Sequence, residues 1–92
     1  MEDSLKLQIE NINTELNKVK LLIEDVMENS EKISTDDNPA LSCIKLVKAL
    51  EKADYIINRT TGNMISVLDY YNSEVTETNN KLADEYVNNI IK

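Results

Sequence analysis

Apolar residues recur at alternating steps of four and three residues through the first third of the chain. A repeat that averages 3.5 residues keeps one stripe of a helix facing a neighbouring helix along its whole length. The pattern therefore predicts a coiled-coil-like helix over about residues 4–33, with Asp3 or Ser4 capping its start. In heptad letters, position a holds Ile9, Leu16, Ile23 and Ser30, and position d holds Leu5, Ile12, Val19, Val26 and Ile33.

A second stripe with the same rhythm follows a short polar loop, residues 34–38. Asn38 before Pro39 is a typical helix start, because the amide side chain caps free N–H groups and proline has no N–H to satisfy. We predict one long helix over about residues 39–91, while an alternative breaks it near Gly62 and gives three helices. After Tyr71 the stripe slips by one residue. Position a holds Cys43, Leu50, Ile57, Met64 and Tyr71, and position d holds Leu46, Ala53, Thr60 and Val67.

The short loop between two periodic helices predicts an antiparallel helical hairpin, so residues 1–92 form a single all-α domain. With one glycine and one proline, the chain has few residues for the turns of a β fold. Folding about Asp36 brings acidic residues at the end of the first helix beside basic residues at the start of the second. The acidic residues are Glu24, Asp25, Glu28 and Glu31, and the basic ones are Lys45, Lys48 and Lys52. Such surface pairs are worth about 0.2–1 kcal/mol each and favour the antiparallel orientation.

The two expected helices differ in length, at about 45 Å and about 80 Å. Residues beyond about Tyr71 therefore have no partner within a two-helix hairpin, so either the tail folds back as a third helix or another molecule covers it. The second helix also carries apolar residues outside its seam, and an apolar face wider than a seam typically packs against two neighbours. The residues predicted to bind a partner are Ile44, Val47, Ile65, Leu68, Val75, Leu82, Tyr86 and Ile90.

Composition argues against an enzyme and against nucleic acid. The chain has no histidine, and its formal net charge is −7, which disfavours binding to a phosphate backbone. Cys43 is the only cysteine; its place on the stripe predicts a small buried side chain, and we expect no catalytic residue, metal site or cofactor. No apolar run approaches the roughly 20 residues of a membrane span. The start, Met1-Glu2-Asp3, lacks the features of a signal peptide, which predicts synthesis in the cytoplasm and, for any export, a route without a cleaved signal.

Residues Tyr70 to Glu74 spell Tyr-Xaa-Xaa-Xaa-Glu, inside the predicted second helix. Together with the short length, the acidity, the hairpin pattern and the Asn-Pro start of the second helix, this motif resembles small helical partner proteins of type VII secretion. Within these, the chain is most similar to the Lap or YwqI-like proteins encoded beside LXG-domain toxins. The turn reads Asp36-Asp37-Asn38-Pro39, where the related hairpins have Trp-Xaa-Gly.

The resemblance implies a targeting chaperone that binds the helical LXG domain of a secreted toxin, alone or with a second small helical protein. It also implies a secretion signal at Tyr70 and Glu74; the alternative for Tyr70 and Tyr71 is packing against the start of the first helix. A second function is a structural coiled-coil subunit of a multi-protein assembly of the tethering, kinetochore or viral scaffold type. Self-association into a homodimer is compatible with both functions.

Overall fold

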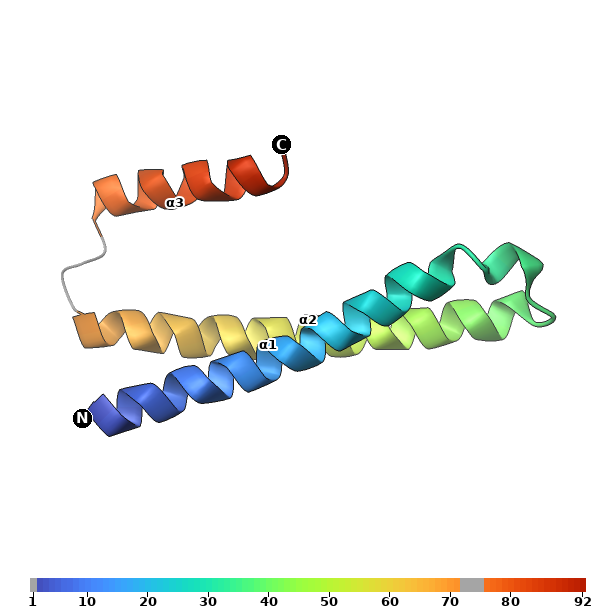
Figure 1. Cartoon of the computed structure of the whole chain (residues 1–92), viewed down its shortest axis with the longest axis horizontal. Coiled ribbons are helices and arrows are strands. Elements are labelled where there is room, and N and C mark those ends of the chain that lie inside the picture. Colours follow the sequence, from blue (N-terminus) through green and yellow to red (C-terminus); the bar gives the residue numbers. More distant parts are fainter. Residues whose placement is uncertain (1, 72–75) are drawn as a thin grey trace.

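The computed structural model describes residues 2–71 and 76–92, the side chain of Glu2 excepted. Within these ranges the regular structure is entirely helical. The elements are α1 (Glu2–Ser30), the 3₁₀ helix η1 (Ile33–Thr35), α2 (Pro39–Tyr71) and α3 (Glu77–Ile90). Figure 1 shows α1 and α2 lying side by side with their chains running in opposite directions, and α3 lying apart from both. The predicted antiparallel hairpin is therefore confirmed.

Two contacts fix the register of the hairpin. The side-chain amide of Gln8 donates a hydrogen bond to the backbone carbonyl of Asn63, at 3.4 Å. Nearer the turn, the Arg59 guanidinium donates to the Glu15 carboxylate. Both pairs lie close to the register obtained by folding the chain about Asp36, which is the register predicted from the sequence.

The turn is built from the capping residues that the sequence offers. Helix α2 begins at Pro39, and the Asn38 side chain accepts a hydrogen bond from the backbone N–H of Leu41 at 3.1 Å, which confirms the predicted cap. Helix α1 begins at Glu2, so the prediction of a cap at Asp3 or Ser4 is wrong. It ends at Ser30, and η1 carries the chain through the region expected as helix and loop.

The prediction of one continuous second helix is wrong. The alternative is right in giving three α-helices in the described residues, but its break at Gly62 is wrong. Gly62 lies inside α2, which ends at Tyr71. A separate helix α3 starts at Glu77, where the Thr76 hydroxyl accepts a hydrogen bond from the Asn79 N–H at 3.2 Å. This N-cap satisfies one of the free donors of the first turn. The slip of the apolar stripe after Tyr71 coincides with the end of α2.

The seam between α1 and α2 uses only half of the predicted positions. The d positions are confirmed on both helices. Among the described residues the buried ones are Ile12, Leu46, Ala53, Ile56 and Thr60. The other half of the seam is position g, one residue before each predicted a position. On α1 the g residues are Gln8, Glu15, Leu22 and Asn29, and on α2 they are Ser42, Ala49, Ile56 and Asn63, all buried or half-buried.

The folded chain exposes more surface than a compact protein of its size. Its accessible area is 7559 Å², whereas a compact monomer of this mass exposes about 5,400 Å². Its radius of gyration is 17.6 Å, against about 12 Å for a compact domain of this length. The difference of roughly 2,000 Å² is the scale that one subunit buries in a large permanent interface.

Candidate partner-binding surface

The shift of the seam from a/d to d/g turns the apolar a positions outward on both helices. At 100° per residue, position a lies about 90° away from the centre of a d/g seam. Since α1 and α2 are antiparallel, the two sets of a residues turn to the same side of the hairpin. They form one surface, the apolar face, made of Ile9, Leu16, Ile23, Leu50, Ile57 and Met64.

Most of this face is open to solvent. Leu16 is 38% exposed and Leu50 is 45% exposed, with Ile9, Ile57 and Met64 between these values, while Ile23 is half-buried. Val47 and Leu68, at position e of α2, extend the face along its outer edge and are also exposed. A contiguous exposed apolar surface of this kind marks a place where another protein element packs.

Small residues on α2 explain why the seam takes the g positions. Ser42 and Ala49 leave room for the larger side chains of α1, and helices approach more closely where the contacting side chains are small. The polar g residues of α1 find partners there, since Gln8 bonds to α2 and Glu15 pairs with Arg59. The larger apolar a residues are then left on the outside.

The opposite side of the hairpin is polar. Glu15 contacts Lys18 at 3.2 Å as well as Arg59, and the hydrogen bonds from Lys18 and then Arg59 hold the pKa of the Glu15 carboxyl below its usual value. The same carboxylate raises the pKa of Arg59. The Tyr55 ring lies between two cations, with Lys52 Nζ at 5.4 Å and the Arg59 guanidinium carbon at 5.3 Å from its centre. On this side the charged side chains of Glu15, Lys18 and Arg59 pair with one another.

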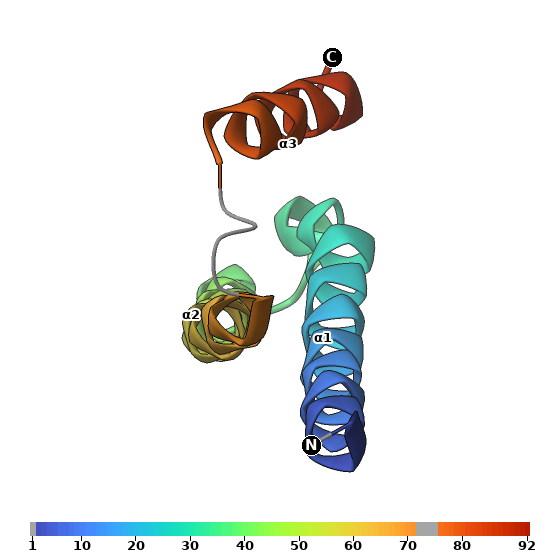
Figure 2. The same ribbon diagram turned by 90° about the vertical axis from the view of Figure 1, so that its left-hand side faces the viewer.

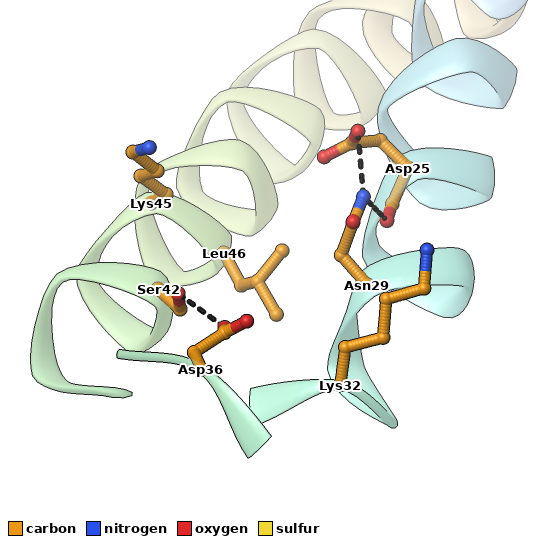
Figure 3. Close-up of a pocket in the computed structure, with 7 residues that line it drawn as sticks. All are labelled: Asp25, Asn29, Lys32, Asp36, Ser42, Lys45 and Leu46. Carbon is orange, nitrogen blue, oxygen red and sulfur yellow. Dashed lines mark hydrogen bonds between the residues drawn. The ribbon is translucent and has the colours of Figure 1, made fainter. Parts of the chain in front are cut away.

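Near the turn, Asp25 and Lys45, two of the acidic and basic residues predicted to face each other, line a cleft, and the predicted residues form no ion pairs between the helices in the described structure. Figure 3 shows this cleft, about 330 Å³ in volume, with Asp25, Asn29 and Lys32 on one wall and Lys45 and Leu46 on the other. Ser42 donates to Asp36 at 2.5 Å, and the Asn29 amide donates to the Asp25 carboxylate at 3.0 Å. The Ser42–Asp36 bond ties the turn to α2, while the Asn29–Asp25 bond lies within α1. In the described part of the chain the one interhelical ion pair is Glu15–Arg59.

The residues predicted to bind a partner are exposed wherever the structure describes them. Ile44 and Ile65, at position b, point away from the seam, and Val47 and Leu68 border the apolar face. Leu82, Tyr86 and Ile90 lie on α3, every residue of which is exposed. Val75 lies outside the described residues. Exposure is compatible with a partner site, but these assignments stay predictions.

The tyrosine pair and the cysteine are also exposed. Tyr70 is 40% and Tyr71 is 48% exposed, and their rings meet edge to face at 5.2 Å. Neither is buried against the start of α1. Glu74, the second member of the predicted signal, lies outside the described residues. The prediction of a buried Cys43 is wrong: it is exposed because it occupies an a position, which the seam does not use.

The sequence pattern missed the apolar face, although it contained a signal. Two of the g positions of α2, Ser42 and Ala49, hold residues small enough for a close helix contact, and an a/d seam leaves those residues unused. Among the described residues there is no cluster of side chains that could hold a metal ion, and no helix there is long and apolar enough to cross a membrane. Comparisons with protein families, with curated proteins and with solved structures give no match to this chain.

Proposed function

We propose that this protein is a non-enzymatic helical adaptor that binds a helical segment of another protein along its apolar face. The observation that carries the proposal is the open row of a residues on two adjacent helices, from Ile9 and Met64 to Ile23 and Leu50. A groove between two helices accepts the apolar stripe of a third helix, with side chains spaced at three and four residues. The excess accessible area is large enough for a stable complex.

The resemblance to type VII secretion partners gives this adaptor a specific form. In that form the partner is the helical LXG domain of a secreted toxin, and the adaptor is its targeting chaperone. One structural feature supports it: α2 ends at Tyr71, so Tyr70 closes the second helix, where the secretion signal of such partner proteins is expected. A folded hairpin with an uncovered apolar face is also what a chaperone of this kind needs before it meets its toxin.

Mixing the purified chain with the LXG-domain protein encoded beside its gene tests the proposal. Size-exclusion chromatography with light scattering should show a complex whose mass contains both proteins. A chain that stays a stable monomer and does not co-elute with that domain contradicts the targeting-chaperone form. Assembly instead with other small helical proteins encoded nearby, without secretion, identifies the structural-subunit alternative.

A further inference from the structure

We propose that α3 closes onto the apolar face of its own hairpin and covers that face until a partner takes its place. The closure is an intramolecular contact between two surfaces that the structure leaves open. Its consequence for binding rests on the proposed function, whereas the closure itself does not. Four observations lead to it.

Helix α3 has a complete apolar stripe that nothing covers. Leu82, Ala83, Tyr86, Val87 and Ile90 fall within about 140° of the helix circumference. The one polar residue inside this arc is Asn79, at the start of the stripe, and the positions of α3 outside the arc are all polar. Leu82 is 58%, Tyr86 68% and Ile90 64% exposed. A helix of 14 residues is marginal in water unless its apolar side packs against something.

The hairpin lacks cover on the side where α3 lies. Figure 2 views the hairpin from the N-terminal end of α1, with α3 on one side of both helices. A right-handed helix seen this way turns clockwise, so the a positions of α1 lie clockwise of the seam. Those of α2, which runs toward the viewer, lie anticlockwise. Both directions lead to the side on which α3 lies, so the apolar face of the hairpin is turned toward α3.

The chain connection favours this occupant over a second copy. Only residues 72–76 separate α2 from α3, and connections of two to eight residues typically join antiparallel neighbours in helical bundles. A short tether also gives α3 an effective concentration on the order of millimolar at its own hairpin. Figure 1 shows α3 running back along the hairpin, antiparallel to α2, as such packing requires.

The length and charge of the reachable surface suit α3. From Leu82 to Ile90 the stripe spans about 12 Å, close to the distance of about 10 Å from Ile9 to Leu16. The a and e positions of this section carry no charge: they are Ile9, Asn13, Leu16, Ile57, Thr61, Met64 and Leu68. The next e residues toward the turn are Lys20 and Asp54. Closure by α3 therefore covers the half of the apolar face that lies away from the turn. Leu50 and Val47, near the turn, stay uncovered.

An indole reporter tests the closure, because the chain contains no tryptophan. In a Tyr86→Trp protein, we expect blue-shifted emission and several-fold weaker acrylamide quenching than for free indole, both unchanged on dilution. Adding Leu16→Asp on the face should shift the emission to the red and restore quenching. Leu21→Asp is the matched control, since Leu21 is more exposed, at 62%, but lies on the other side of α1.

Each outcome supports the closure or overturns it. Emission like that of free indole at all concentrations means that α3 stays open. A blue shift that disappears on dilution means that a second copy covers α3. Met64→Asp is a second face variant in case Leu16→Asp lowers the helical content, and an unchanged emission in both folded variants also overturns the closure. Because no partner is present, failure here leaves the co-elution test of the proposed function intact.

Discussion

Leu46 and Leu50 lie one helical turn apart on α2, and truncating them to alanine should have very different effects on stability. The heptad pattern places both leucines in the seam with α1. In the structure Leu46 is 8% exposed and Leu50 is 45% exposed. Both lie toward the turn, outside the part of the face that α3 can reach. The pair therefore reports the position of the seam alone.

The expected difference follows from how much contact each side chain loses. A buried leucine replaced by alanine typically costs 2.7–5 kcal/mol, so we expect Leu46→Ala to lower the free energy of unfolding by about 3 kcal/mol. Leu50 realises only about half of the roughly 2 kcal/mol that full burial provides, so Leu50→Ala should cost about 1 kcal/mol or less. Leucine and alanine have similar helix propensities, which adds only tenths of a kcal/mol to either variant.

Urea unfolding followed by far-UV circular dichroism measures both costs. The free energy comes from the midpoint and the m-value, and an unchanged m-value shows that the unfolded states are comparable. A difference of about 2 kcal/mol corresponds to roughly a 30-fold change in the unfolding equilibrium. Equal costs, or a larger cost for Leu50→Ala, would refute the d/g seam and restore the a/d seam.

Three further substitutions test individual features of the hairpin. Thr60→Val should raise the free energy of urea unfolding by about 1 kcal/mol, because Thr60 is 2% exposed and its hydroxyl has no hydrogen-bond partner in the described structure; a loss of stability would show that the hydroxyl is satisfied. Gly62→Ala should stabilise α2 by about 1 kcal/mol, since a Cβ there meets nothing within 4 Å; a lower melting temperature would place Gly62 outside a regular helix. Glu15→Gln should lower the melting temperature at pH 7. The lowered pKa of Glu15 means that its pairing stabilises the fold above the ordinary value of 4.5 and is lost as the pH falls through the folded-state pKa. The difference between the variant and the unmodified protein should therefore shrink in melts recorded at decreasing pH, and a constant difference would contradict the pairing.

Local sequence signals predicted the elements well where only one arrangement was open to them. Asn38 and Pro39 start a helix in any hairpin, and the d positions are apolar or small on both helices. The register followed from the loop position, because folding the chain about Asp36 sets the two apolar stripes side by side. These features depend on neighbouring residues or on a single pairing of two helices.

The position of the seam could not be predicted in the same way. A helix with an apolar stripe wider than one seam can pack in two rotational settings, a/d or d/g. The choice depends on contacts between distant residues, here Gln8 with Asn63 and Glu15 with Arg59. It also depends on the small Ser42 and Ala49, which favour close approach only when α1 faces them. Exposure of Cys43 and of the apolar face follows from that choice.

The end of α2 was hidden for a related reason. Residues around Gly62 carry the weakest helix propensity, yet the helix continues there because Thr60 and Asn63 remain in the seam. The separate helix α3 was marked only by the slip of the stripe after Tyr71 and by the capping residue Thr76. In the sequence alone, both signals mark the end of a helix less strongly than a glycine does.

The affinity of two leucine variants for the proposed partner, an LXG-domain protein, tests the central claim most directly. Leu16→Asp places a charge on the apolar face, and burying an unpaired charge in a helix contact costs several kcal/mol. For Leu16→Asp we predict a dissociation constant at least about 100-fold larger than that of the unmodified protein. Leu21→Asp should bind as tightly as the unmodified protein. Calorimetric titration of folded proteins measures all three. Equal binding by Leu16→Asp, or a loss confined to Leu21→Asp, would contradict the assignment of the apolar face as the partner-binding surface.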